Sequence, residues 1–282
     1  MLLTSLLAYL GIANNKIITI HHPANGFAHA TVGFVGLYGA LTGMSSKGIT
    51  VSEANLESND ISFRGFPWIL RLRYVMSYAS NMQEALDLWS GTNSTVGFNH
   101  GIGSGNEQKA VVLETMAHSN PVFAPMDERE VNNGGNPRSD AVYRTNHGFD
   151  PYTVAHYMWN DTGAYQDSIY RYELFPQLLD QYQSDSNIIG HSLTHSLTHS
   201  LTHSLTHSGA VEAVNITAVV AGKGQDSVYS CTGPFDDGDN VLSVTYDPSS
   251  LTVYAAWESN NGNWITAACN TYLQIDLSPF FA

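Results

Sequence analysis

The chain has 282 residues, which suffices for one sizeable domain or at most two. Its 43% hydrophobic and 11% aromatic residues indicate a globular rather than a disordered protein. The formal net charge of −14, with only 11 lysines and arginines, argues against nucleic acid and anionic membrane surfaces as partners. No stretch reaches the roughly 18 apolar residues of a transmembrane helix.

The first predicted strand covers residues 16–22, where β-branched side chains predominate. A Pro-Ala-Asn-Gly turn at 23–26 separates it from a second strand that begins at Phe27. Residues 1–10 are apolar but contain no basic residue, so we interpret them as domain interior and find no clear signal peptide. Because the chain opens in the middle of a sheet, we expect it to be truncated at its N-terminus.

The segment from Gly33 to Asn55 predicts a β-hairpin. Apolar and small residues alternate up to Thr42, a glycine-bounded turn occupies 43–48, and β-branched residues recur at period two over 49–55. The second arm ends in Asn55, a residue type that is disfavoured in strands. Its carboxamide can donate two hydrogen bonds to a developing oxyanion, and it can equally begin a turn. The residue pattern alone leaves both interpretations open.

Two helices are expected after the hairpin. The first begins around Pro67 and presents apolar residues at helical spacing up to Ala79. The second covers residues 82–89, with Asn81 as its N-cap and Glu84 completing a capping-box pattern. Helices that pack on sheet strands predict an α+β fold.

Residues 109–116 predict a further strand, flanked by loops at 102–106 and 120–140. Glu114 interrupts the apolar run of this strand. A lone acid in such a position is usually a structural residue whose hydrogen bonds are satisfied within the core. We therefore assign Glu114 no chemical role.

A short strand is predicted at 141–147 and ends in Thr-Asn-His. Asn146 would form a two-donor anion site if it lay near Asn55, and a turn residue is the structural alternative. The helix expected at 167–183 carries Arg171, which could hold a carboxylate, lower a thiol pKa or simply lie on the surface. Three more strands are predicted, at 213–221, 240–246 and 251–257.

Residues 191–208 repeat the tetrapeptide His-Ser-Leu-Thr, so histidine recurs at every fourth position. On a helix these histidines would share one face and could bind zinc. A perfect repeat also results from expansion of a short DNA unit, which gives a low-complexity insert in a surface loop. We favour the insert and assign it no metal and no function. Residues 1–282 are then one domain interrupted by this insert.

The hairpin sequence GMSSKGITVSEAN at 43–55 resembles that of N-terminal-nucleophile (Ntn) hydrolases. It is most similar to the cysteine branch of acyl-CoA:6-aminopenicillanate acyltransferase-like proteins, peptidase family C45, to which acid ceramidase-like proteins are related. Ser45 stands where these proteins usually have asparagine, and the loop at 102–106 lacks their aspartate. Further motifs of the family follow in the family's order: AVVLE at 110–114, TNH at 145–147, SIYRY at 168–172 and the terminal hairpin at 241–254.

The resemblance implies a four-layer αββα Ntn-hydrolase sandwich, truncated at its N-terminus. It also implies an amide hydrolase or acyltransferase that acts on linear C–N amide bonds through a cysteine thioester. Asn55 and Asn146 would stabilise the oxyanion, and Arg171 would support the substrate or the thiolate. The substrate would be a small-molecule acyl amide or an acyl-CoA-type compound, with no cofactor and no metal.

The nucleophile of the family is an N-terminal cysteine, and this sequence has no cysteine before Cys231. The Arg- and Asp-containing segment that follows the nucleophile in the family also has no counterpart. We therefore expect the chain as written to be inactive. The alternative interpretation is a non-catalytic relic of the family that binds a ligand in the old pocket.

The two cysteines, Cys231 and Cys269, could form one disulfide or remain two buried thiols. Glycosylation candidates occur in three Asn-x-Ser/Thr sequons, at Asn93, Asn160 and Asn215. Together with the acidic composition they fit a secreted protein or one in a lysosomal or vesicular lumen. No residue pattern selects one substrate or one oligomeric state.

Overall fold

The computed structural model describes residues 15–159, 163–182, 240–260 and 262–282. The strand predicted at 213–221 and the repeat at 191–208 lie outside these ranges. Within the described ranges, seven antiparallel strands form a large sheet in sequential order: β1 (Lys16–His21), β2 (His29–Phe34), β3 (Thr42–Ser45), β4 (Ile49–Asn55), β5 (Phe98–Ser104), β6 (Lys109–Thr115) and β7 (Val122–Phe123).

A second, three-stranded sheet comes from the C-terminal part of the chain. Its strand order is β12 (Leu273–Asp276), β9 (Thr252–Trp257) and β8 (Leu242–Asp247), and a small β10 (Ser259–Asn260) to β11 (Trp264–Ile265) ribbon adjoins it. The helices are α2 (Trp68–Tyr78), α3 (Met82–Ser90), α4 (Glu128–Asn132), α5 (Pro151–His156) and α6 (Gly163–Tyr182), and short 3-10 turns occur at Ala267–Cys269 and Ser278–Phe280.

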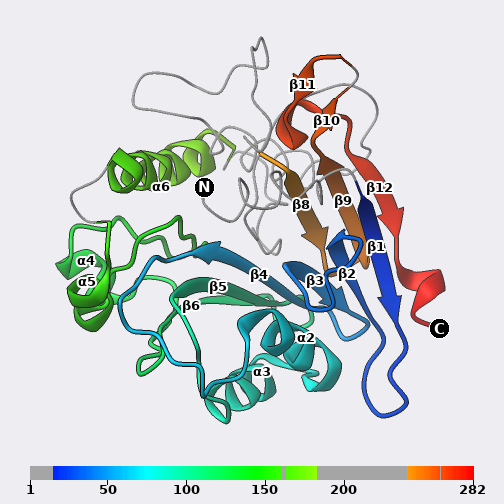
Figure 1. The fold of residues 1–282 in the computed structure, drawn as a ribbon, viewed down its shortest axis with the longest axis horizontal. Helices are drawn as coiled ribbons and strands as arrows, with labels where there is room; N and C mark the ends of the chain where they lie inside the picture. The colour runs from blue at the N-terminus through cyan, green and yellow to red at the C-terminus, as the bar shows by residue number, and fades with distance from the viewer. Residues whose placement is uncertain (1–14, 160–162, 183–239, 261) are drawn as a thin grey trace.

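The two faces of the large sheet bury different clusters. Alternate residues of β2, such as Val32, pack with Val244 and Val253 of the second sheet. Alternate residues of β4 and β5 pack instead against α2 and α3. Figure 1 shows α2 and α3 on one side of the large sheet and α6 on the other. The α2 and α3 helices on one face of the large sheet and the second sheet on the other agree with the αββα fold that the resemblance implies, while α6 packs on Phe123 of β7 and on Tyr143 and Phe149.

The hairpin that the sequence predicts is present, with a shorter first arm. β3 begins only at Thr42 and includes residues 43–45, so the turn is confined to residues 46–48. Gly48 in this turn has φ of +71°, a conformation that suits glycine. Gly43 is needed for space instead, because a Cβ there would lie 2.5 Å from the carbonyl oxygen of Ala30.

The loop predicted at 102–106 is wrong, because β5 continues through Ser104. Residues 98–104 contain two glycines and three polar residues, which is unfavourable for a strand in isolation. β5 nevertheless pairs along its full length with both β4 and β6. Its neighbours, rather than its own residue preferences, therefore determine its conformation.

The long loop predicted at 120–140 contains regular structure that the Gly, Pro and Asn content concealed. β7 pairs with β6, and α4 is capped by Asp127, whose side chain accepts a hydrogen bond from the amide of Arg129. The helix predicted at 82–89 is present as α3, and Asn81 caps it by accepting from the amide of Glu84 at 2.9 Å. No described helix is long and apolar enough to span a bilayer.

Candidate functional site

Asn146 and Asn55, the two asparagines that the sequence singled out, are in direct contact. Nδ2 of Asn146 donates a hydrogen bond of 2.8 Å to the backbone carbonyl oxygen of Asn55 at the end of β4. The side chain of Asn55 is held separately, because its Nδ2 donates to Oε2 of Glu57 at 3.1 Å. Both side chains are half-buried. The 141–147 segment is thereby joined to the strand end in the main sheet.

Arg171, the third predicted residue, extends the same chain of hydrogen bonds. Its Nη2 donates to Oδ1 of Asn146 at 2.8 Å, and its Nε donates to Oδ2 of Asp167 one helical turn earlier, also at 2.8 Å. Both polar atoms of the Asn146 carboxamide are thus engaged, which fixes its orientation. Nη1 of Arg171 makes no hydrogen bond within the described residues.

Ser168 anchors the Thr-Asn-His segment to α6. Its Oγ accepts from the backbone amide of Asn146 at 2.7 Å and lies 2.8 Å from Nδ1 of His147. The hydroxyl of Thr145 donates to the carbonyl of Ser168 at 2.7 Å. The sequence associated Ser168 with a separate motif, and nothing in its spacing indicated that the two motifs interlock.

The short strand predicted at 141–147 is wrong, because this segment joins no sheet. Its backbone is bonded by side chains instead. Nδ2 of Asn99 in β5 donates to the carbonyls of Thr145 and His147, at 2.8 Å each. Side-chain bonding of this kind replaces a strand ladder and gives the segment an irregular path over the site.

His147 completes the segment but is not a cation at neutral pH. Burial, with the nearby charges of Arg144 and Arg171, lowers its pKa to about 3. Its ring packs edge-on against Phe149 and Tyr172. We therefore place His147 among the residues that hold the site together rather than among proton carriers.

A buried ionic cluster supports the site from behind. Arg144 donates from Nε to Glu114 at 3.0 Å and from Nη1 to Glu130 at 2.7 Å. Its guanidinium also lies over the rings of Phe123 and Phe149. Burial opposes the positive charge, but the two carboxylates outweigh it, so the pKa of Arg144 is raised. Glu114 is the satisfied buried acid that its sequence position predicts.

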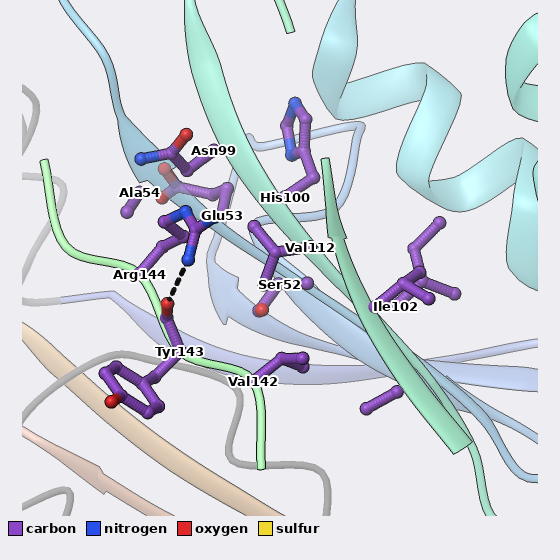
Figure 2. Close-up of a pocket in the computed structure, with 13 residues that line it drawn as sticks. Ser52, Glu53, Ala54, Asn99, His100, Ile102, Val112, Val142, Tyr143 and Arg144 are labelled. Atoms are coloured by element: carbon purple, nitrogen blue, oxygen red, sulfur yellow. Dashed lines mark hydrogen bonds between the residues drawn. The ribbon is translucent and has the colours of Figure 1, made fainter. Parts of the chain in front are cut away.

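A small pocket of about 30 Å³ lies beside this cluster. Figure 2 shows it between β4, β5, β6 and the 142–144 segment. Glu53 of β4 lines it, and burial raises the pKa of its carboxyl group to about 7. Sequence reasoning missed Glu53, because it lies within the 43–55 hairpin motif at a position to which the motif gives no chemical role.

The other sequence candidates are less completely described. Asn93 is exposed, whereas Asn160 and Asn215 lie outside the described residues. Cys269 is disulfide-bonded, and Cys231 lies outside the described residues. In the described part of the chain, no three histidine, cysteine or acidic side chains are grouped so that they could hold a metal ion.

The fold is similar to that of a solved bile acid hydrolase. A variant of conjugated bile acid hydrolase from Clostridium perfringens superposes with a TM-score of 0.51 at 15% identity, over 94% of this chain and 85% of that one. Penicillin V acylase from Agrobacterium tumefaciens gives 0.43 at 10% identity, over 89% and 75%. The Caenorhabditis elegans N-acylethanolamine-hydrolyzing acid amidase orthologue gives 0.38 at 15% identity, over 60% and 68%. No curated protein matches the sequence.

The αββα arrangement and the bile acid hydrolase comparison define an Ntn-hydrolase fold. The model of one family, acyl-coenzyme A:6-aminopenicillanic acid acyl-transferase, matches residues 11–221. This chain therefore belongs to that family. The family is described as one of acyl-transferases, which agrees with the acyltransferase resemblance of the sequence motifs.

Proposed function

We propose that this chain binds the acyl group of an amide or acyl-CoA-type substrate at the junction of Asn55, Asn146 and Arg171. The observation that carries the proposal is the continuous series of hydrogen bonds from Asp167 through Arg171 and Asn146 to the end of β4. An asparagine that is fixed at both polar atoms is preorganised, and preorganised donors stabilise a carbonyl oxygen as it gains negative charge.

The roles follow from the geometry. Nδ2 of Asn146 has two hydrogens, and its bond to the Asn55 carbonyl uses one of them. The other is available to a substrate carbonyl. Arg171 holds the carboxamide in place and offers Nη1 to a negatively charged part of the ligand. The side chain of Asn55, steadied by Glu57, would supply a second donor.

We further propose that residues 1–282 bind such a ligand without turning it over. The resemblance requires a cysteine nucleophile with a free α-amino group. The sequence contains only Cys231 and Cys269, both late in the chain, and Cys269 is disulfide-bonded. Oxyanion donors without a nucleophile retain binding and lose the covalent step.

A binding titration with N-ethyloctanamide tests this function. We expect Asn146→Ala to weaken binding about tenfold, which corresponds to about 1.4 kcal/mol for the lost hydrogen bonds. Asn132→Ala is the matched control, because Asn132 is exposed on α4 and should leave the affinity unchanged. Octanoyl-CoA, titrated in parallel, distinguishes an acyl-CoA preference from an amide preference.

Two results would contradict the proposal in different ways. Equal affinity of the wild type and Asn146→Ala for both ligands would show that Asn146 does not form part of a binding site for them. Release of octanoate by residues 1–282, blocked by a thiol reagent, would instead show that these residues catalyse hydrolysis through a cysteine. Binding and catalysis are thus tested separately.

We propose a secreted or lumenal location, supported by the three sequons and the exposure of Asn93. Expression through a secretory pathway should then attach glycan to Asn93. Mass spectrometry of the peptide that contains Asn93 tests this expectation, with Asn93→Gln as the control. A fully unmodified peptide from secreted protein would contradict it.

A further inference from the structure

The pocket beside the ionic cluster adjoins the Asn55–Asn146 junction along two chain segments. Residues 52–54 of β4 line it and lead directly into Asn55, while residues 142–144 line it and lead into Asn146. At about 3.3 Å per strand residue, the Cα atom of Glu53 lies roughly 7 Å from that of Asn55. A group in this pocket would therefore lie close to the proposed acyl site without being part of it.

Three polar side chains at one end of the pocket have bonding capacity to spare. Asn99 is 2% exposed, and its Oδ1 has no hydrogen-bond partner, although its Nδ2 is fully engaged. Arg144 is 3% exposed, and its Nη2 also lacks a partner. The half-buried carboxyl group of Glu53 accepts no hydrogen bond from any described residue. Buried polar atoms left unbonded are costly unless a ligand or water satisfies them.

Figure 2 shows the side chains of Glu53, Asn99 and Arg144 gathered at one end of the pocket, while His100 points away from them. The available acceptors are the two carboxylate oxygens of Glu53 and Oδ1 of Asn99. The one available donor is Nη2 of Arg144. A ligand with several donor hydrogens therefore matches this end of the pocket better than an acceptor does.

The charge balance favours a cation as well. Arg144 is the positive group here, and Glu114 and Glu130 already neutralise it. An ionised Glu53 adds a negative charge that forms no hydrogen bond or ion pair with a described residue, and the positive charge of the N-terminus offsets it only in part, since the pKa of Glu53 stays raised. An anionic ligand would meet this excess of carboxylates, whereas a cation would relieve it.

We propose that this pocket binds a primary ammonium group, which donates hydrogen bonds to the carboxylate of Glu53 and to Oδ1 of Asn99. The site goes beyond the proposed acyl-binding function, because it requires neither an acyl group nor a nucleophile. Its position next to the junction suits a ligand that carries an amino group near the bound carbonyl.

Glu53 is the group expected to make binding pH-dependent. Among the other titratable lining groups, burial lowers the pKa of His100 to about 3 and raises that of Tyr143, so both stay neutral between pH 5 and 8. Arg144 remains charged, and Glu114 and Glu130 face it from β6 and α4. The positive charge of the chain's N-terminus also acts on Glu53 and opposes the rise of its pKa, and an α-amino group titrates near pH 8. A pH-dependent change in ammonium binding is therefore attributable to Glu53 when Glu53→Gln abolishes it.

Ethylammonium is the probe, followed by NMR shifts of the Glu53, Ala54 and Asn99 amides. A three-atom ligand should bind with a Kd of about 1 mM or weaker. We expect Glu53→Gln to weaken binding at least tenfold at pH 8. Because the pKa of Glu53 is about 7, the wild type should bind about a hundredfold more weakly at pH 5 than at pH 8.

Glu128→Gln is the matched control, since Glu128 is exposed on α4. The affinity of this variant for ethylammonium should stay within about twofold of that of the wild type. Ethanol and acetate should cause no comparable shifts. The proposal fails if Glu53→Gln binds ethylammonium as well as the wild type, if ethanol or acetate binds equally, or if affinity is the same at pH 5 and 8.

If Glu53→Gln folds poorly, the pH comparison is made on wild-type protein with an acetylated N-terminus, which removes the α-amino group and leaves Glu53 as the group that titrates. A failure here also leaves the acyl-binding proposal intact, because N-ethyloctanamide carries no ammonium group. Conversely, loss of amide binding in Asn146→Ala would not move the ethylammonium titration.

Discussion

Replacing Arg144 with methionine should lower the free energy of unfolding by about 3–5 kcal/mol. The guanidinium pairs with Glu114 and Glu130, and the three side chains are 3%, 0% and 5% exposed. Methionine retains much of the volume between Phe123 and Phe149 but leaves two buried carboxylates without their counter-ion. Removing one partner of a buried pair is far more damaging than replacing the pair as a whole.

Urea denaturation at pH 7 measures this loss. Arg64→Met is the control, because Arg64 is exposed and should change stability by less than about 0.5 kcal/mol. The double variant Arg144→Met/Glu114→Gln should lose less than the sum of its single changes, because one stranded charge has been removed. A loss below about 1 kcal/mol in Arg144→Met would show that the cluster is solvated and contradict this account.

Replacing Glu53 with glutamine should stabilise the protein at high pH and leave it unchanged at low pH. Burial raises the pKa of Glu53 from 4.5 to about 7 in the folded state. Between these values the folded chain holds a proton that the unfolded chain has lost. Ionisation therefore destabilises the folded state, and wild-type stability falls as pH rises through this range.

The difference amounts to about 3 kcal/mol above pH 7, at about 1.4 kcal/mol for each pKa unit. Denaturant unfolding of both proteins at pH 4, 6 and 8 tests it. The gap between the two curves should be near zero at pH 4 and largest at pH 8. Parallel curves across this range would mean that Glu53 titrates normally, and the unpaired, desolvated state assigned to it would be wrong.

Sequence reasoning succeeded where a residue pattern is local. The β-branched residues of β4 and the Asn81 cap of α3 act over a few neighbours, so their structures follow from their own residues. β5 could not be predicted in this way, because pairing with β4 and β6 determines its conformation. Non-local pairing overrides weak preferences in a central strand.

The same distinction between local and non-local information applies to the candidate site. Asn55, Asn146 and Arg171 were found through motifs, and the structure places them in one series of hydrogen bonds. Glu53 and the spare acceptor of Asn99 were missed, because their significance depends on what surrounds them. Burial, unsatisfied bonds and pocket shape arise only when distant segments meet.

The bond from Asn146 to residue 55 ends on a main-chain oxygen, which every amino acid supplies. Mutational drift at position 55 can therefore change the side chain there without releasing Asn146. A substitution at position 55 therefore changes the second proposed donor while Asn146 stays anchored. For directed evolution, position 55 is thus a natural place for saturation mutagenesis, because variants with new side chains keep the remaining scaffold of the site.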